Sequence, residues 1–312
     1  MVAAPDIRPR ASLPKPADAR VLVAGLVCNA GGKVAADVQR LGRALAAFKQ
    51  VQWLLIESDS SDDTLAELAR LRSAIEGFDY TSLGALSSSL PLRTQRIAHC
   101  RNAYLERLDS SPELAAIDLV LMADFDGINN RVDEAAIGSS WVRDDWDVCA
   151  ANPAGPYYDI WALRHPLWSP NDYKSGYRFL VEHGIAAEAA LQATVLSRMV
   201  TIDPRAPWIE VDSAFGGLAI YRRSALRGLR YAGLGADGQE VCEHVGVHEQ
   251  IRAAGGRIFI NPRLVCAGAN EHTRVLGFSK KIERVVRRAG KRVLLAVRPA
   301  HGASELPLRG EQ

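Results

Sequence analysis

The sequence predicts an α/β fold: a Rossmann-like, mixed but mostly parallel sheet flanked by helices. The chain's opening is the first reason, because the apolar run 21–27 leads into the turn 28–32 and then into apolar residues at helical spacing. A second apolar run, 51–56, leads into another helical pattern. The third reason is the run 117–122, whose apolar residues cover both faces, as in a strand buried within a parallel sheet. The turn does not match G-x-G-x-x-G, so a dinucleotide fingerprint is not supported.

The remaining elements follow from the same two patterns, taken along the chain. Short apolar runs predict further strands at residues 79–83, 147–151 and 257–260, with two short ones within 208–221. Helical spacing predicts helices from Leu65 and over residues 93–108, 132–140, 184–199 and 239–254. Residues 87–92 and 168–177 are expected as loops, and Ser60 or Ser61 as the N-cap of the helix near Leu65.

Composition places the 312-residue chain among soluble proteins of one large or two small domains. No apolar run reaches the about 20 residues that a membrane span needs. Residues 1–19 are rich in Pro and Ala without a continuous apolar core, so we expect a disordered lead-in and not a signal peptide. The five cysteines are widely spaced and form no C-x-x-C pair, which favours reduced thiols and a cytoplasmic location.

Charge is unevenly distributed along the chain. Residues 273–312 hold ten Lys and Arg against three Glu, a net charge of +7, which leaves −5 for the rest of a chain of net charge +2. Apolar residues recur at helical spacing within this tail, so we expect a basic amphipathic helix that either packs on the body or lies on an anionic membrane surface. Aromatic residues do not interleave with its bases, so nucleic acid is not an expected partner.

Asp124 and Asp126 follow directly after the buried strand predicted at 117–122. Two carboxylates so close together are costly to desolvate unless a cation lies between them. Divalent cations prefer oxygen ligands, and open α/β sheets bind ligands at the carboxyl ends of their strands. The Asp-x-Asp pattern therefore predicts a Mn²⁺ or Mg²⁺ site that holds a nucleotide diphosphate. The alternative is a loop with two solvated Asp residues.

Other polar residues stand where they can meet a nucleotide. Glu57 and Asp59 end the predicted strand 51–56, where carboxylates accept hydrogen bonds from a nucleobase or ribose. Arg96 and Arg101 lie in the predicted helix 93–108 and have the geometry for bidentate contacts with a diphosphate. A pair of solvated helix cations is the alternative for the two arginines.

The second half of the chain offers candidates for an acceptor site. Residues 157–164 are rich in aromatic side chains, which pack on apolar sugar faces, and we assign Asp159 and Trp161 to acceptor binding. Core packing is the alternative for Trp161. Gly216 and Gly217 lie between two short apolar segments and allow a ligand to approach the backbone closely.

His244 and His248 are four residues apart and share a face of the helix predicted at 239–254, as in two-histidine zinc sites. The segment reads H-V-G-V-H, so the acid of an H-E-x-x-H motif is missing. A zinc hydrolase is therefore not the expected function.

Taken together, these motifs resemble those of GT-A-fold glycosyltransferases, and more closely the fungal mannosyltransferases of mannan-polymerase and cryptococcal-capsule type. The resemblance rests on S-D-S-S-D-D-T at 58–64, R-I-A-H-C-R-N at 96–102, L-M-A-D-F-D at 121–126, and D-W-D-V-C-A-A-N with Y-D-I-W-A-L-R within 145–164. It continues through D-S-A-F-G-G-L-A-I-Y at 212–221 and G-R-I-F-I-N-P at 256–262. Residues 20–272 are accordingly expected to form a GT-A domain.

The resemblance implies a hexosyltransferase that uses a nucleotide-sugar donor, with GDP-mannose favoured, and a Mn²⁺ or Mg²⁺ ion. The acceptor is a hydroxyl of a glycan or lipid-linked molecule, and transfer retains the configuration of the sugar. By position, the resemblance places these residues at the donor: Gly25, Glu57, Asp59, Arg96, Arg101 and Asp124. It places Asp124 and Asp126 at the metal.

A third metal ligand and a base are also implied. The histidine nearest to the expected ligand position is His272, although the ungapped position falls near Ala267, and His244 and His248 are rivals. Asp212 and Glu243 are the candidate catalytic acids or bases, although in retaining enzymes of this fold a diphosphate oxygen can take the acceptor proton. A nucleotidyltransferase acting on sugar phosphates and a non-catalytic nucleotide-sugar-binding protein remain alternatives. The expected location is the cytoplasm, or the inner membrane face if the tail binds lipid.

Overall fold

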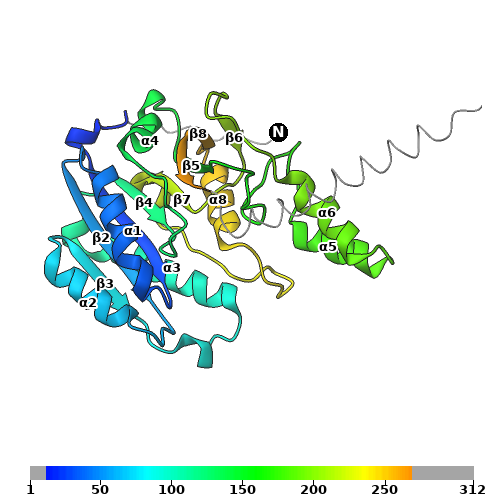
Figure 1. The fold of residues 1–312 in the computed structure, drawn as a ribbon, viewed down its shortest axis with the longest axis horizontal. Coiled ribbons are helices and arrows are strands. Elements are labelled where there is room, and N and C mark those ends of the chain that lie inside the picture. The colour runs from blue at the N-terminus through cyan, green and yellow to red at the C-terminus, as the bar shows by residue number, and fades with distance from the viewer. Residues whose placement is uncertain (1–11, 269–312) are drawn as a thin grey trace, which may run out of the picture. The chain divides into compact units, whose positions relative to one another are not determined.

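An eight-stranded sheet forms the centre of the protein in the computed structural model, which describes residues 12–268 (Figure 1). The strands are β1 (Arg20–Val27), β2 (Gln50–Glu57), β3 (Phe78–Ser82), β4 (Leu119–Ala123), β5 (Val148–Pro153), β6 (Ile209–Val211), β7 (Leu218–Arg222) and β8 (Ile258–Ala267). The helices are α1 (Gly31–Ala44), α2 (Thr64–Ala74), α3 (Arg93–Ser110), α4 (Glu134–Gly138), α5 (Tyr173–Glu182), α6 (Ala187–Thr194), α7 (Arg223–Leu226) and α8 (Glu243–Ala253).

The strand order is β3-β2-β1-β4-β7-β5-β8-β6. Strands β1 to β4 pair in parallel in the order 3-2-1-4 of a Rossmann half, and β5 pairs in parallel with β8. Strand β7 is antiparallel to both β4 and β5, and β6 is antiparallel to β8. The predicted mixed, mostly parallel sheet is therefore confirmed, and the carboxyl ends of β1 to β5 and β8 share one edge.

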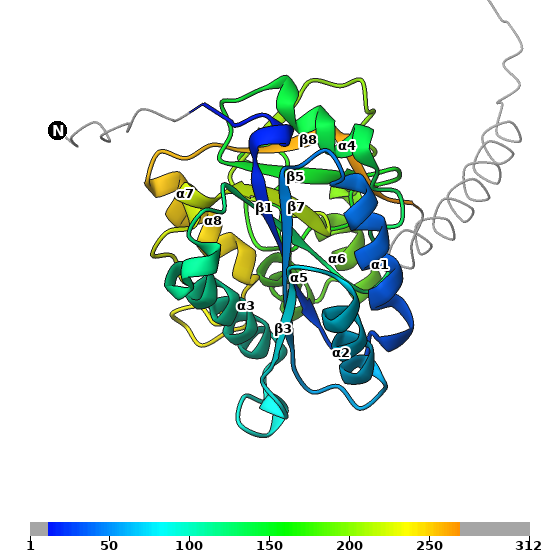
Figure 2. The same cartoon turned by 90° about the vertical axis from the view of Figure 1, so that its left-hand side faces the viewer.

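Helices cover both faces of the sheet because successive side chains of a strand point to opposite sides. Val21 and Val23 of β1 pack with α1, whereas Leu22 and Ala24 pack with α3. Figure 2 shows α3 and α8 on one side of the strands and α1 and α2 on the other. The two apolar cores hold the strand ends, and hence the side chains beyond them, in fixed positions.

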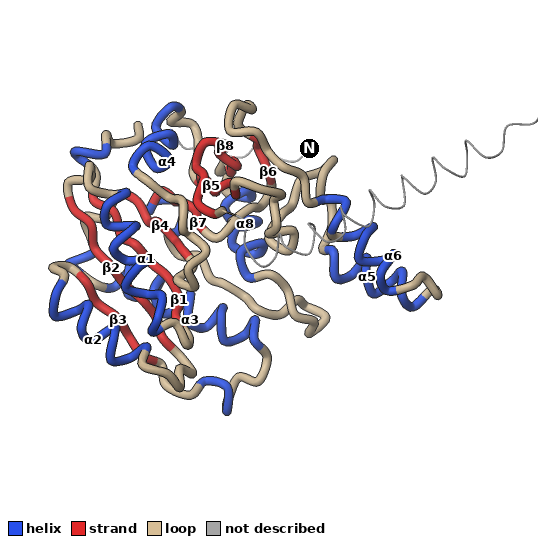
Figure 3. Tube along the Cα trace, viewed as in Figure 1, coloured by secondary structure: helices blue, strands red, loops and turns tan. Residues whose placement is uncertain are grey.

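Helices α5 and α6 form a hairpin between β5 and β6, and Figure 3 shows it extending beyond the sheet. The loop expected at 168–177 is wrong from Tyr173 onward, because Asp172 caps α5 by accepting a hydrogen bond from the Lys174 amide at 2.8 Å. No residue of α5 is buried. The hairpin therefore contributes little to the core, and the described residues contain no helix long and apolar enough to span a membrane.

Other predicted boundaries also differ from the structure, among them that of the helix expected over 184–199, where α6 spans Ala187–Thr194. Asp63, not a serine, is the N-cap of α2, because Ser60 and Ser61 bond instead to the amide and side chain of Asn29. Helix α8 begins at Glu243, four residues later than predicted. Within the lead-in expected to be disordered, residues 12–19 have a defined structure: the Trp141 indole donates to the Pro14 carbonyl at 2.8 Å, and Pro16–Asp18 form a short 3-10 helix. Residues 1–11 and the tail 273–312 lie outside the described residues.

Candidate functional site

The loop after β4 carries Asp124 and Asp126 to the carboxyl edge of the sheet. The Asp124 amide donates to the Gly217 carbonyl at 3.0 Å, and the Asn129 side chain donates to the Asp124 carbonyl at 2.8 Å. From α1, the buried carboxylate of Asp37 accepts a hydrogen bond from the Gly127 amide at 2.8 Å. The backbone of the Asp-x-Asp loop is thus fixed from both neighbouring elements.

Asp124 lies among more carboxylates than cations. Its side chain is partly buried and accepts no hydrogen bond from a residue within 12–268. Burial, opposed by the charge of Arg101 and helped by the charges of Asp126 and Asp159, raises the pKa of Asp124 to about 7. Such a carboxylate favours an added positive charge, because a cation stabilises its ionised form.

Arg101 and Glu243 form a buried ion pair next to Asp124. The Arg101 Nε lies 2.9 Å from the Glu243 Oε1, and the two side chains are 6% and 8% exposed. The Arg101 guanidinium also lies over the ring of Phe215, 5.5 Å from its centroid. Glu243 is therefore occupied in holding Arg101, which limits its availability as a base.

The carboxyl end of β2 forms a second polar cluster on the same edge. Both oxygens of the buried Glu57 are occupied, one by the Ser60 amide at 2.9 Å and the other by the Ser82 hydroxyl at 2.5 Å. Asp59 adopts a left-handed backbone (φ 61°), accepts from the Ser87 amide at 2.8 Å and lies 3.7 Å from Arg96. Hydrogen bonds from Ser87 lower the pKa of Asp59. Glu57 therefore shapes this edge, and Asp59 and Arg96 line it.

Protein atoms lie close to all three glycines that the sequence predicts to contact ligands, Gly25, Gly216 and Gly217. A side chain at Gly25 would meet the Phe125 ring at 2.3 Å, and one at Gly216 would meet the Ala151 carbonyl at 2.8 Å. At Gly217 the space is taken by the Tyr158 hydroxyl at 2.7 Å. Gly216 and Gly217 also have positive φ angles of 74° and 91°. A larger residue at any of the three positions would clash with these protein atoms, which explains why each is glycine.

Asp159 and Trp161 lie between the carboxylate cluster and the α5–α6 hairpin. Asp159 accepts a hydrogen bond from the Gly216 amide at 2.9 Å, and burial raises its pKa. Trp161 is partly buried against the core and donates from its indole to Asp172 at 3.0 Å. The structure therefore brings Asp159 to Asp124 but fixes Trp161 toward the start of α5.

Asp212 is not brought to this cluster. It follows β6, whose end pairs with the amino-terminal end of β8, and β8 runs parallel to β5. Asp212 therefore lies at the edge of the sheet opposite to Asp124. Its carboxylate lies 3.5 Å from Arg252 and its side chain is 49% exposed. The sequence alone does not reveal on which edge of the sheet Asp212 lies, because the order of strands in the sheet differs from their order in the chain.

The histidine rivals for the third metal ligand are core residues of α8. The ring nitrogens of His248 are bonded to the Ser213 hydroxyl at 2.7 Å and the Tyr221 hydroxyl at 2.8 Å. His244 stacks on Phe215, with ring centroids 4.0 Å apart, and neither of its nitrogens has a hydrogen-bond partner among residues 12–268. His248 is therefore excluded as a ligand by its hydrogen bonds, and His272 lies outside the described residues.

The residues fit a divalent cation that is shared with phosphates. Within residues 12–268, no group of three or more His, Cys, Asp and Glu is placed to hold a metal ion by itself. Mg²⁺-type sites, however, commonly use one or two carboxylates together with substrate phosphates. Asp124, whose carboxylate accepts no hydrogen bond from residues 12–268, and the exposed Asp126 supply two hard oxygen ligands of this kind.

Asp37 is a site residue that the sequence analysis missed. Its carboxylate supports the Asp-x-Asp loop from α1 by accepting a hydrogen bond from the Gly127 amide, which lies 90 residues later in the chain. Its signal was present in the sequence: Asp37 falls on the same helical face as Val34 and Leu41, where a charge is costly unless it is paired.

No protein-family model matches this sequence, and a search of curated proteins also finds no match. Among solved structures, the chain is similar to the mannosyltransferase PcManGT from Pyrobaculum calidifontis in complex with GDP-Man and Mn²⁺, with 16% identity and a TM-score of 0.45 over 84% of this chain and 60% of that one. It is also similar to S. aureus TarS 1–349, with 12% identity and a TM-score of 0.45 over 80% of this chain and 60% of that one.

A third similar structure is mannosyl-3-phosphoglycerate synthase from Rubrobacter xylanophilus, with 15% identity and a TM-score of 0.38 over 93% of this chain and 79% of that one. The match spans only 60% of the length of the first two proteins. At these identities and TM-scores the likeness does not bear on what this chain binds.

Proposed function

We propose that this chain is a metal-dependent glycosyltransferase that moves a sugar from a nucleotide-sugar donor to an acceptor hydroxyl. The observation that carries the proposal is the Asp124 carboxylate at the carboxyl edge of the parallel strands. It accepts no hydrogen bond from residues 12–268, and burial together with the charges of Asp126 and Asp159 raises its pKa to about 7. A site with excess carboxylate at this edge suits a cation with a diphosphate. The sequence motifs at 58–64, 96–102 and 121–126 point to the same class.

The residues at this edge have separate tasks in the proposed reaction. Asp124 and Asp126 would hold Mn²⁺ or Mg²⁺, which when bound neutralises charge on the departing diphosphate. Arg101, fixed by Glu243, adds a permanent positive charge beside Asp124. Asp37 and Gly217 keep the loop in place without reorganisation during the reaction.

The donor and stereochemistry follow from the sequence resemblance. We propose GDP-mannose as the donor and retention of configuration, with a glycan or lipid-linked molecule as the acceptor. Retention of this kind needs no protein base, because a diphosphate oxygen takes the acceptor proton. The remote position of Asp212 and the pairing of Glu243 with Arg101 suit such a reaction.

A thermal-shift screen tests the proposal most directly. GDP, UDP and their sugars are added to the full chain with Mn²⁺, and a bound nucleotide is expected to raise the melting temperature by about 5 °C or more at saturation. EDTA should remove the shift, and release of GDP from GDP-mannose should identify turnover. If no nucleoside diphosphate stabilises the chain with Mn²⁺, the proposal fails; stabilisation without turnover of any donor would indicate a non-catalytic binding protein.

The tail supports a separate proposal about location. We propose that residues 273–312, with a net charge of +7, hold the enzyme on an anionic membrane surface at the cytoplasmic side. Flotation with anionic liposomes should be lost when the chain is cut at Val275. Equal flotation of the two forms would contradict this placement.

A further inference from the structure

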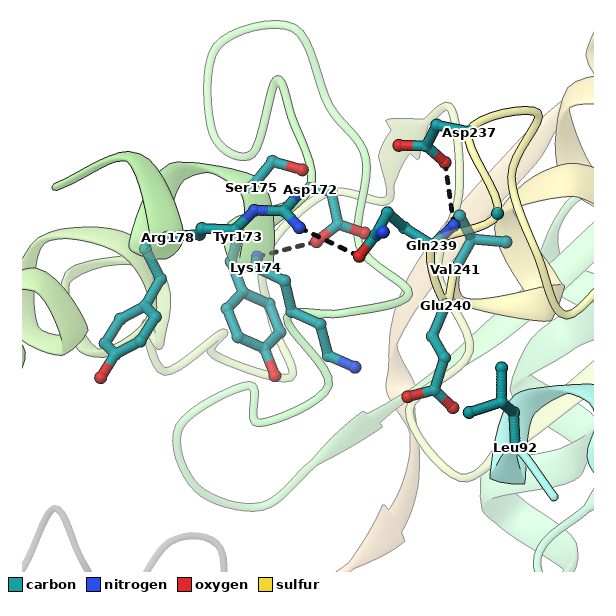
Figure 4. Close-up of a pocket in the computed structure, with 12 residues that line it drawn as sticks. Leu92, Asp172, Tyr173, Lys174, Ser175, Arg178, Asp237, Gln239, Glu240 and Val241 are labelled. Carbon is teal, nitrogen blue, oxygen red and sulfur yellow. Dashed lines mark hydrogen bonds between the residues drawn. The ribbon is translucent and has the colours of Figure 1, made fainter. Parts of the chain in front are cut away.

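A cavity of about 550 Å³ lies between the start of α5 and the segment 237–241 (Figure 4). Tyr173, Lys174 and Glu240 direct their polar ends into the same space, and Leu92 lies at its border. Its volume falls within the range of small-molecule sites, about 300–1,000 Å³. None of the candidate site residues described above lines this cavity.

Polar contacts fix the two walls of the cavity. An Arg178 nitrogen donates to the Gln239 side chain at 3.0 Å, which joins α5 to the opposite segment. Glu240 accepts from the Thr94 hydroxyl at 2.9 Å, which joins that segment to α3. These side-chain contacts hold the two walls in place. No residue of α5 is buried, so none fills the space between the walls.

The start of α5 is fixed in turn to the chain around Asp159. Asp172 accepts from the Trp161 indole and from Arg164, both at 3.0 Å. The Lys174 amine lies over the Trp161 ring, 3.4 Å from its centroid. The cavity wall therefore has a defined geometry and is more than a solvent-exposed helix face.

The cavity adjoins the carboxylate cluster through three segments. Trp161, which donates to Asp172 at the cavity wall, stands two residues after Asp159. Glu243 follows two residues after Val241, which lines the cavity. Thr94 and Arg101 lie two turns apart on α3. The cavity walls thus belong to the same segments of chain as residues of the carboxylate cluster.

The lining has the chemistry of a carbohydrate site. Tyr173 and Tyr177 offer aromatic faces to the apolar side of a sugar ring, while Gln239, Glu240 and Lys174 offer donors and acceptors for its hydroxyls. The ionised side chains are Asp172, Asp237, Glu240, Lys174 and Arg178, so cations do not outnumber carboxylates. A phosphate or carboxylate group would lack a cationic pocket here.

We propose that this cavity binds the acceptor as a neutral, polyhydroxylated glycan and presents one of its hydroxyls to the donor. The role as an acceptor subsite rests on the proposed glycosyltransferase function. Binding of a neutral saccharide does not depend on that function, because it needs neither metal nor nucleotide.

Saturation-transfer NMR of the full chain with a panel of neutral di- and trisaccharides tests the cavity, without metal or nucleotide. Tyr177→Ala should weaken the binding of a saccharide from this panel about five- to tenfold, the effect of one aromatic contact. The matched control is Phe179→Ala, which removes another exposed aromatic ring of α5 that does not line the cavity and should leave binding unchanged. Both variants should keep the wild-type far-UV spectrum.

The same variants separate this inference from the proposed function. Tyr177→Ala should leave the Mn²⁺-dependent melting shift with nucleotide unchanged, and Asp126→Asn should leave saccharide binding unchanged. The inference is overturned if no neutral saccharide binds, if only phosphorylated sugars bind, or if Tyr177→Ala and Phe179→Ala weaken binding equally. A missing nucleotide shift with intact, Tyr177-dependent saccharide binding would instead refute the donor reaction alone.

Discussion

Arg101 of α3 and Glu243 of α8 form an ion pair of 2.9 Å at the base of the candidate site, where both side chains are more than nine-tenths buried. The pair joins two helices that pack on the same face of the sheet. Because a carboxylate and a guanidinium are both costly to desolvate, each is stable in this place only with the other. The pair therefore serves stability and the charge of the site together.

Arg101→Ala should lower the free energy of unfolding by about 3–5 kcal/mol, since it leaves the buried Glu243 without its partner. Urea denaturation measures the change. Arg205→Ala is the matched control, because Arg205 and its partner Asp203 are 90% and 51% exposed, and such a pair contributes about 0–1 kcal/mol. Equal losses in the two variants would contradict the role given to burial.

Asp126→Asn should remove Mn²⁺-dependent nucleotide binding and sugar transfer while changing the free energy of unfolding by about 0.5 kcal/mol or less. The Asp126 side chain is exposed, and its Oδ1 accepts from the Ile128 amide at 3.0 Å, a bond that Asn can keep. Thermal shifts with and without Mn²⁺ provide the measurement. Asp109→Asn, at an exposed position of α3, is the control. Full turnover by Asp126→Asn in EDTA would remove the metal from the mechanism.

The parts of the fold that bury apolar residues could be predicted from the sequence. Strand β4 is apolar at all five positions and buried at all five, so its end, and with it Asp124, was placed correctly. Helix α3 was predicted because its buried residues recur at helical spacing. The loop expected over 168–177 overlooks helix α5, in which Tyr173, Tyr177 and Leu180 recur at helical spacing although no residue of the helix is buried.

The site residues that depend on strand order could not be predicted. Strand β7 lies between β4 and β5, so Gly217 reaches the Asp124 amide from a segment more than 90 residues later. The same topology carries Asp212 away to the opposite edge. Glycine at 216 and 217 was recognised as a sign of close approach, but the sequence did not reveal that the approaching atoms belong to Ala151 and Tyr158.

Gly216→Ala should destabilise the protein by about 1–3 kcal/mol more than Gly238→Ala does. Both glycines have a φ of 74°, so both variants carry the strain of a left-handed backbone. Only at residue 216 would the new methyl group meet backbone, the Ala151 carbonyl at 2.8 Å, whereas nothing lies within 4 Å at residue 238. Chemical denaturation of the two variants isolates the cost of the clash. Equal destabilisation would mean that the backbone at 216 relaxes freely.

His248 should make the protein less stable as the pH falls below 6.5. Burial and, to a smaller extent, the nearby charge of Arg101 lower the pKa of His248 to about 3. The unfolded chain therefore takes up a proton near pH 6.5 that the folded chain refuses until about pH 3. As the pH falls from 6.5 toward 3, the proton uptake of this one histidine lowers the free energy of unfolding by up to about 1.4 kcal/mol per pH unit.

His248→Gln tests this assignment, because a carboxamide can still bond to the Ser213 and Tyr221 hydroxyls but does not titrate. His244, stacked at 5.8 Å, and Arg101 also face His248 and are unchanged in the variant. Urea denaturation between pH 7 and pH 4 should show a smaller loss of stability for His248→Gln than for the wild type. The difference in slope should correspond to about one proton fewer taken up on unfolding. Parallel pH profiles would show that His248 takes up its proton in the folded state, contrary to its two hydrogen bonds and its burial.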